Sequence, residues 1–431
     1  MPLRLSTQDA GFSEAFEGLV HSKREADEDV SAIAQTIIDD VRARGDAALI
    51  EYTERFDRFD VAATGLQISP EEIAAALSRV EPELLSALEL AAARIEAFHE
   101  RQLPESFSYT DEAGLTLGMR WGSIDAVGLY VPGGLAAYPS SVLMNALPAK
   151  VAGVERRVMV VPTPDGQVND LVLAAASIAG INEVWRVGGA QAIAALAYGT
   201  ETIAKVDKVV GPGNAFVAAA KRIVFGQVGI DSIAGPSEIL VVADADNDPS
   251  WIAIDLLSQA EHDEVAQAIL ITDDAAFADA VEAAVHTQLS TLPRTEIAAK
   301  SWADHGAIIV VGSLDEAPAL VDRLAPEHLE LAVDEPEALA IKIRHAGAIF
   351  LGRHTPEAVG DYIAGPNHVL PTARTARYSS GLGVLDFLKR TTTVAASAEG
   401  LAEIGPSAIR LAEAEGLQAH ARSIAVRLSA D

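Results

Sequence analysis

The stretch GIDSIAGPSEILVVADADNDPSWIAIDLLSQAEHD, residues 229–263, joins a loop, a strand and a helix in one run. The Gly/Pro/Ser loop leads into the apolar residues 239–243, which predict a strand buried on both faces. Asp248 then offers an N-cap and Pro249 takes the first helical position, so a helix is predicted from about Ser250. A buried strand followed by a helix is the unit of an α/β fold.

Two polar residues stand near the end of this predicted helix. Gln259 and His262 are three apart and therefore share one face. The amide oxygen of Gln259 and an imidazole nitrogen of His262 each have a lone pair that a cation can take. On spacing alone, two polar residues on a solvated helix surface are the simpler interpretation, and a metal site is the alternative.

The same unit recurs on both sides of this stretch. Before it, strands are predicted at residues 126–131, 157–161, 184–187 and 208–210. After residues 239–243, further strands are predicted at residues 268–272, 307–311, 329–333 and 348–351. Turns rich in Gly or Pro follow the first four strands, and helices come between. Repeated βα units imply parallel sheets with right-handed crossovers, whose ligands collect outside the carboxyl ends of the strands.

The Gly-rich turns do not complete the dinucleotide fingerprint G-x-G-x-x-G. Gly211 and Gly213 supply its first half, but Phe216 occupies the third position. These glycines either only turn corners or let the backbone approach a phosphate closely. Three polar side chains beside the turns favour a ligand: Tyr130, Gln191 and Asn214.

The predicted organisation is α/β, with two domains that carry parallel sheets. Residues 1–25 lack periodicity and are expected to form an N-terminal arm. Residues 26–128 and 239–382 are expected to form one large discontinuous α/β domain, and residues 129–238 a second one. Residues 383–431 are expected to be a small helical segment.

Composition excludes several classes of partner and chemistry. The formal net charge of −30 argues against nucleic acid and anionic membrane surfaces. This charge does not exclude an anionic cofactor, for which only local backbone N–H groups and helix N-termini remain as binding groups. The chain has no cysteine, which excludes disulfides, thiolate ligands and a cysteine nucleophile. No apolar run is long enough to cross a bilayer, and the N-terminus does not resemble a signal peptide, so we expect a cytoplasmic protein.

Three further places carry polar residues that structure alone does not require. Asp361 comes shortly before a loop that contains His368. Glu327 and His328 follow Pro326, and they can line one cleft only if the chain turns there. Near the C-terminus, Glu415 ends a helix and His420 falls on the apolar face of the next one. Here His420 is either a satisfied core histidine or a ligand.

These blocks together resemble the histidinol dehydrogenase family, along essentially the whole chain. The specific pieces, in order, are GPSEI at 235–239, SQAEHD at 258–263, APEHLE at 325–330, GDY with GPNHVLPT at 360–372 and EGLQAH at 415–420. The resemblance implies the zinc-dependent oxidation of L-histidinol to L-histidine through the aldehyde, with two NAD⁺, at the end of histidine biosynthesis. It also implies two incomplete Rossmann-like domains in an intertwined homodimer, whose C-terminal segments complete each other's active sites.

The resemblance also implies roles for individual residues. One zinc ion per subunit would be bound by Gln259, His262, Asp361 and His420. His328 resembles the base that takes the alcohol proton, and Glu327 the group that activates water. Ser237, His368 and Glu415 would hold the substrate together with His328 and the zinc ligands. Contacts to NAD are implied for Tyr130, Gln191 and Asn214.

Elementary chemistry agrees with these implied roles. An imidazole titrates near neutrality, as a base for an alcohol proton must. An aldehyde has no hydroxyl proton to lose and must first gain an oxygen nucleophile; without cysteine, water activated by a carboxylate remains. Two rival functions stay open, a zinc hydrolase acting on a small nitrogenous substrate and a binding protein without chemistry. The yield of NADH from histidinol separates all three.

Overall fold

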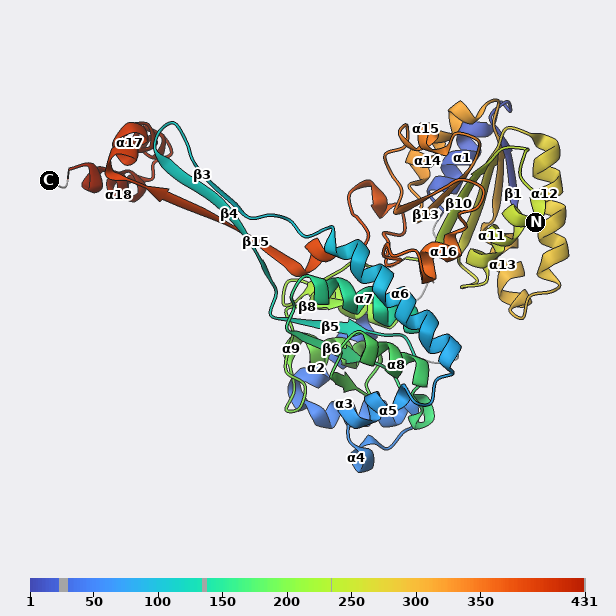
Figure 1. Cartoon of the computed structure of the whole chain (residues 1–431), viewed down its shortest axis with the longest axis horizontal. Coiled ribbons are helices and arrows are strands. Elements are labelled where there is room, and N and C mark those ends of the chain that lie inside the picture. The colour runs from blue at the N-terminus through green and yellow to red at the C-terminus, as the bar shows by residue number, and fades with distance from the viewer. Residues whose placement is uncertain (23–29, 134–137, 234, 430–431) are drawn as a thin grey trace.

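The computed structural model describes residues 1–22, 30–133, 138–233 and 235–429. Gly134 and Ala234, which belong to two of the predicted turns, lie outside these ranges, as does part of the predicted arm. The described chain forms two α/β bodies and one long projection (Figure 1). We call the bodies the β10 body and the β5 body after their central strands. No helix of the described residues combines the length and the apolarity needed to cross a bilayer.

The β10 body contains a six-stranded sheet in which every pairing is parallel. Its strands, in spatial order, are β1 (Leu3–Ser6), β12 (Ala307–Val310), β11 (Gln267–Thr272), β10 (Glu238–Ala243), β13 (His328–Ala332) and β14 (Ala348–Leu351). Alternate residues of β10 face two separate apolar cores, with Leu240 in one and Val241 in the other. The strand is therefore covered on both faces, as its unbroken apolar run predicted.

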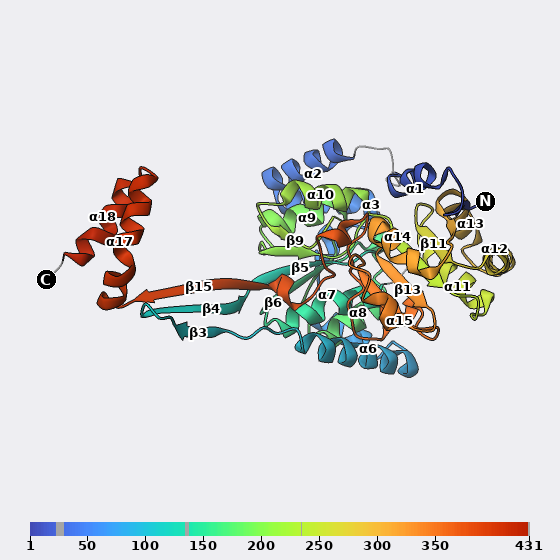
Figure 2. The ribbon, with the colours of Figure 1, turned by 90° about the horizontal axis from the view of Figure 1, so that it is seen from above.

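Helices cover both faces of this sheet (Figure 2). On one face lie α1 (Phe12–Val20), α14 (Ala317–Leu324) and α15 (Pro336–Ala340). On the other face lie α11 (Pro249–Ala260), α12 (Ala275–Leu289) and α13 (Thr295–His305). The N-cap predicted for α11 is confirmed, because the Asp248 side chain accepts a hydrogen bond from the Ser250 N–H at 2.8 Å. A short helix, α16 (Glu357–Tyr362), follows β14.

The β5 body contains the second six-stranded sheet. Its order is β2 (Gln67–Ile68), β7 (Glu183–Trp185), β6 (Arg156–Val160), β5 (Ala126–Tyr130), β8 (Lys208–Val210) and β9 (Gly229–Ile230). All pairs are parallel except β2 with β7. One face packs against α5 (Pro70–Ala76), α6 (Pro82–Glu100), α7 (Pro139–Val151) and α8 (Asp170–Ile178). The other packs against α2 (Ser31–Arg44), α3 (Asp46–Asp57), α9 (Gly189–Tyr198) and α10 (Ala215–Val224).

Two domain assignments expected from the sequence are wrong. Residues 1–25 were expected to form a separate arm, but β1 pairs with β12 at the edge of a sheet, and Phe16 of α1 is fully buried in the core. Residues 26–128 were expected to join the domain of residues 239–382, but the helices α2 to α6, including the short α4 (Val61–Thr64), cover the sheet of the β5 body. An amphipathic pattern identifies the apolar face of a helix and not the sheet that this face will cover.

The projection is a three-stranded antiparallel ribbon that ends in two helices (Figures 1 and 2). The ribbon consists of β15 (Leu388–Ala396), β4 (Leu115–Ser123) and β3 (Phe107–Thr110), and its tip of α17 (Ala398–Ala414) and α18 (Gln418–Leu428). The expectation that residues 383–431 are helical is therefore corrected for β15. That strand pairs with β4 along its whole length. The run Thr391-Thr392-Thr393-Val394 within it is β-branched throughout, which favours a strand.

Candidate active site

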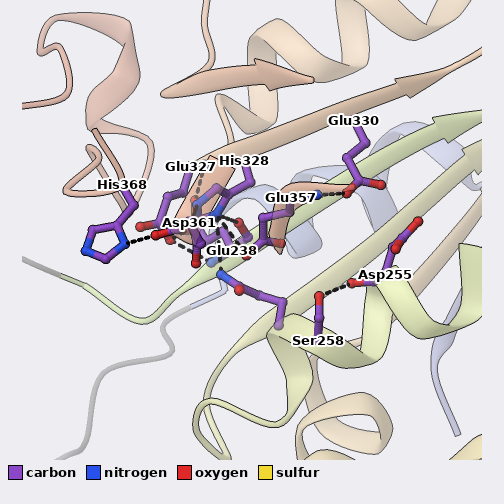
Figure 3. Close-up of polar contacts among 10 residues, drawn as sticks. Glu238, Asp255, Ser258, Glu327, His328, Glu330, Glu357, Asp361 and His368 are labelled. Atoms are coloured by element: carbon purple, nitrogen blue, oxygen red, sulfur yellow. Dashed lines mark hydrogen bonds and ion pairs between the residues drawn. The ribbon is translucent and has the colours of Figure 1, made fainter. Parts of the chain in front are cut away.

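The chain turns sharply just before β13, and the turn brings two adjacent side chains to one place. After α14 ends at Leu324, Ala325 adopts the left-handed conformation with φ of 46°. Glu327 and His328 follow, both buried, in a cluster at the amino end of β13 (Figure 3). One carboxylate oxygen of Glu327 lies 3.8 Å from the His328 Nδ1 atom. Both side chains therefore face one site, as the sequence allowed if the chain turned here.

Glu327 forms two hydrogen bonds with Glu238, at the start of the neighbouring strand β10. Its Oε2 atom accepts a hydrogen bond from the Glu238 N–H at 2.9 Å, and the Glu327 N–H donates to Glu238 Oε2 at 3.3 Å. Burial raises the pKa of Glu327 to about 7; the His328 charge opposes this shift and the Glu238 charge adds to it. A carboxylate with such a pKa can exchange a proton with water at neutral pH.

His328 lies among carboxylates, and its two ring nitrogens face different partners. Its Nδ1 atom lies 3.0 Å from the Glu238 backbone oxygen, so the Nδ1–H tautomer donates there. Its Nε2 atom faces Asp361 Oδ1 at 3.6 Å and has no hydrogen-bond partner among the described residues. Burial alone would lower the pKa of His328, but the charges of Glu357, Glu327 and Asp361 outweigh it and raise this pKa well above its ordinary value.

The helix α16 supplies two of these carboxylates, and α11 supplies an amide beside them. Glu357 and Asp361 are four residues apart and so lie on one face of α16. The Gln259 amide satisfies both of its polar atoms when its nitrogen donates to Glu357 Oε1 at 2.9 Å and its oxygen accepts from the Glu238 N–H at 2.9 Å. Gln259 is therefore in direct contact with the cluster.

This cluster suits a divalent cation. Side-chain ligand atoms of His328, Glu357 and Asp361 all lie within 4.8 Å of one another. Burial raises the pKa of Glu357 to about 8, with His328 opposing this shift and Asp361 adding to it. Amide oxygen, imidazole nitrogen and carboxylate are donors that Zn²⁺ accepts. Of these three close residues, only Asp361 belongs to the ligand set implied by the resemblance.

His262 lies just beyond the helix on which it was predicted. Because α11 ends at Ala260, the residue stands in the turn that follows, and its N–H donates to the Gln259 carbonyl at 3.1 Å. His262 is exposed as a residue, yet partial burial of its imidazole lowers its pKa, and Asp361 opposes that shift. The imidazole therefore lies within electrostatic range of the cluster, on its solvent side.

The two other predicted contacts on this body border the same cluster. The Nδ1 atom of His368 lies 3.0 Å from the Asp361 backbone oxygen, to which the Nδ1–H tautomer donates (Figure 3). The preceding Asn367 donates to the Met144 carbonyl of α7 at 2.6 Å, which anchors this loop to the β5 body. Ser237 is half-buried and directly precedes Glu238 at the start of β10. The cluster thus lies at the amino ends of β10 and β13, away from the carboxyl ends where ligands were expected.

Two predicted site residues, Glu415 and His420, do not lie near the cluster around His328 within one chain. Glu415 caps the end of α17 and His420 lies in α18, both exposed at the tip of the projection. In both views this tip stands far from the β10 body, and Figure 1 shows the length of the ribbon between the tip and α16 (Figures 1 and 2). His420 is therefore not a buried core residue within this chain, which excludes that alternative.

The predicted cofactor residues meet in a cavity of about 740 Å³ in the β5 body. Tyr130, Gln191 and Asn214 all line it, and it opens at the carboxyl ends of β5, β6, β7 and β8, as predicted. The Gly189 N–H donates to the Tyr130 hydroxyl at 3.1 Å, and burial raises the pKa of Tyr130 to about 12. The buried Gln191 Oε1 atom has no partner among the described residues. Arg55 of α3 also lines the cavity and adds a cation that the sequence did not predict there.

The structure adds acidic residues that sequence reasoning missed. Glu238 and Glu357 contact the predicted site directly, and Glu330 accepts a hydrogen bond from the Glu357 N–H at 2.6 Å. Next to Glu330, the pKa of Asp255 is raised to about 6, mainly by burial. The four-residue spacing of Glu357 and Asp361 was a signal available in the sequence. Glu330 lies within a strand predicted to be buried, and Glu238 directly precedes another; a charged residue is unusual at both positions.

Comparisons with known proteins agree with this picture. Residues 20–428 match the family model described as histidinol dehydrogenase. The chain is 69% identical to the histidinol dehydrogenase of Rhodospirillum rubrum over 430 residues, covering 100% of this chain and 99% of the relative. It is 63% identical to that of Rhizobium meliloti over 429 residues, covering 100% and 99%. The crystal structure of histidinol dehydrogenase from Elizabethkingia anophelis superimposes with a TM-score of 0.94 at 38% identity, covering 99% of this chain and 98% of that one. The chain belongs to the histidinol dehydrogenase family.

Proposed function

We propose that this enzyme oxidises L-histidinol to L-histidine through L-histidinal, with two NAD⁺, as the last step of histidine biosynthesis. Membership of the family supports the reaction. The single observation that carries the proposal is the buried pair of Glu327 and His328 within one acidic cluster. That pair provides two proton acceptors, an imidazole and a carboxylate. The reaction requires two bases, one for the alcohol proton and one for the water that attacks the aldehyde.

The first oxidation needs a base for the alcohol. His328 keeps its Nδ1–H on the Glu238 carbonyl. The nearby carboxylates raise its pKa, and a bound zinc ion would offset their charge, which would leave Nε2 unprotonated as the accepting atom. In the proposed step, Nε2 takes the hydroxyl proton while hydride leaves the same carbon for NAD⁺. The hydrogen bond from Nδ1 fixes the tautomer and the orientation of the ring.

The second oxidation needs water. L-histidinal must become its hydrate before a second hydride can leave, and the chain has no cysteine to form a covalent adduct instead. Glu327, with its pKa near 7, is the proposed base that takes a proton from this water. The sum is one alcohol, two NAD⁺ and one water converted to one carboxylate, two NADH and three protons.

Zinc would be bound by Gln259, His262 and Asp361 of one chain and by His420 of the partner subunit. When bound, the ion supplies a fixed positive charge to which the imidazole and amine of the substrate bind, and which offsets the carboxylates around His328. Ser237 and His368 would hold the substrate from the same chain, and Glu415 of the partner subunit from the other. Figures 1 and 2 support a shared site, since the tip that carries Glu415 and His420 stands away from its own cluster.

NAD⁺ is proposed to bind in the cavity of the β5 body. Tyr130 keeps its phenol proton at any physiological pH, so its hydroxyl can donate to the cofactor while it accepts from Gly189. The unpartnered Gln191 oxygen and the side chain of Asn214 offer further polar contacts. Arg55 would add a favourable charge for the diphosphate.

The yield of NADH per histidinol tests this function. With histidinol limiting, zinc present and NAD⁺ in excess, we expect about two NADH per histidinol, measured by absorbance at completion, because each oxidation transfers one hydride. A yield of one would reduce the protein to a simple alcohol dehydrogenase. No NADH would favour the hydrolase or the binding protein.

A further inference from the structure

Lys221 and Asp231 form a buried ion pair beside the loop that leads to the cavity of the β5 body. Lys221 belongs to α10, and Asp231 directly follows β9. Their Nζ and Oδ1 atoms form an ion pair, with side chains only 4% and 5% exposed. The Asp231 N–H also donates to the Val209 carbonyl of β8 at 3.3 Å, which places this carboxylate at the end of the sheet.

The pair forms hydrogen bonds with both backbone groups of Gly211. The Gly211 N–H donates to Asp231 Oδ2 at 2.8 Å, and Lys221 Nζ donates to the Gly211 carbonyl at 3.1 Å. The negative partner thus accepts from the amide and the positive partner donates to the carbonyl. Charge-assisted bonds of this kind are stronger than neutral ones, so the peptide units on either side of Gly211 are fixed in orientation.

Gly211 needs such restraint because its backbone is unusual. Its φ is 112°, a left-handed conformation, and a Cβ added there would lie 2.1 Å from the Tyr130 carbonyl oxygen. The loop therefore passes directly over the end of β5, next to Tyr130, which lines the cavity. A small rotation at Gly211 would move every residue that follows.

The residues that follow form part of the cavity wall. Gly213 and Asn214 line the cavity, and Asn214 caps α10 by accepting from the Val217 N–H at 3.2 Å. Lys221 lies further along that same helix. The ion pair thus hydrogen-bonds to Gly211 at the start of the loop, and its Lys221 belongs to α10, the helix that follows the loop. Residues 211–214, which form part of the cavity wall, are therefore fixed at both ends.

Stability alone is a weak explanation for this arrangement. Removing two charges from water is unfavourable, and a well-packed apolar pair of similar size is often as stable or more stable. A buried pair is better suited to fixing one conformation among several. Here the conformation that it fixes is that of a loop at the proposed cofactor site.

We propose that Lys221 and Asp231 are positioning residues for NAD⁺, which set the loop of residues 211–214 without touching the cofactor. This inference rests on the proposed binding of NAD⁺ in the cavity. It assigns to the pair an effect on cofactor binding that is separate from folding and from the chemistry at Glu327 and His328.

The full-length Lys221→Met variant tests this. We expect its dissociation constant and KM for NAD⁺ to rise about tenfold, because the loop loses one of its two anchors. The KM for histidinol and kcat at saturating NAD⁺ should stay within about threefold, since the buried cluster of the other body is unchanged. The dissociation constant comes from titration calorimetry with NAD⁺ alone, and the kinetic constants come from NADH absorbance.

A matched control separates positioning from general destabilisation. Arg156 pairs with Glu183 and donates to the Lys205 carbonyl in the same body, but at the amino ends of the strands, away from the cavity. Arg156→Met should lower the melting temperature while leaving the affinity for NAD⁺ within twofold of the wild type. If Lys221→Met does not fold, the double variant Lys221→Met/Asp231→Asn removes both charges and should show the same tenfold loss of affinity.

The outcomes distinguish the two proposals. Unchanged affinity for NAD⁺ in the Lys221→Met or the double variant would overturn the positioning role. An equal loss of affinity in Arg156→Met would overturn it as well, because stability alone would then explain the effect. Failure of the wild-type protein to bind NAD⁺ would instead overturn the proposed function.

Discussion

Glu327→Gln is expected to stop the reaction after its first half, with about one NADH formed per histidinol. The glutamine oxygen can still accept from the Glu238 N–H, so the local structure should persist. An amide cannot take a proton from water, and loss of a general base costs about 10²- to 10⁴-fold, so aldehyde oxidation should slow by that factor. Alcohol oxidation, for which His328 is the proposed base, should change by less than about tenfold. Single-turnover measurements with histidinol and with histidinal separate the two steps.

The pH dependence of the same step gives a second readout of Glu327. A base works in its ionised form, so a pKa near 7 predicts that aldehyde oxidation falls about tenfold per pH unit below pH 7. Glu327→Gln should lack this inflection. Glu337→Gln, an exposed position on α15, is the matched control and should keep both rates and the inflection. Equal loss of both oxidations in Glu327→Gln would contradict the division of labour between the two residues.

His262→Ala and His420→Ala should each abolish zinc binding and activity, and mixing the two variants should restore part of both. Loss of a direct ligand should exceed the roughly 10- to 100-fold cost of changing an outer-shell partner. In a symmetric dimer with shared sites, each hybrid contains one site with both histidines intact. Random exchange should therefore recover about a quarter of the wild-type activity. Activity and zinc per dimer, measured after exchange, check this.

A second mixture serves as the control for that experiment. His262 and Asp361 belong to the same side of the proposed shared site, so mixing His262→Ala with Asp361→Asn leaves every site broken. This mixture should give no recovery. Recovery in both mixtures, or in neither, would contradict a site in which His420 comes from the partner subunit.

Local sequence signals were enough for much of the fold. The N-cap at Asp248, the proline after it and the apolar run before it predicted β10 and α11 in nearly their observed places. The strands β8 and β14 were predicted with their observed bounds. Such elements are specified by residues close together in the chain, and periodicity and caps report on those directly.

The ribbon and the packing of α2 to α6 could not be predicted in this way. The strand β15 pairs with β4 although Leu388 and its partner Ser123 are far apart in the sequence. Eight of the nine residues of β15 are exposed, so no alternation of apolar and polar residues marks it. The register of a solvent-exposed ribbon depends on its partner strand, and a single sequence pattern does not contain that information.

For the site, the sequence indicated the residues but not their distances. Gln259, Glu327, His328, Asp361 and His368 lie together on the β10 body, at the ends of strands and helices that the βα pattern predicted. Glu357 was missed although its four-residue spacing from Asp361 was visible, because a helix of only six residues gives a weak periodic signal. His420 could be assigned to the site only by the resemblance, since α18, which carries it, lies at the tip of the projection, away from the β10 body (Figure 1).

The identity of the metal ligands is the most direct test of this account, because one chain offers two different sets. A crystal structure of the zinc-loaded protein, with the ion located by anomalous scattering, distinguishes them. We predict an ion bound at about 2.0–2.2 Å by Gln259, His262 and Asp361 of one chain and by His420 of the partner subunit. An ion held within a single chain by His328, Glu357 and Asp361, with His420 far away, would contradict it.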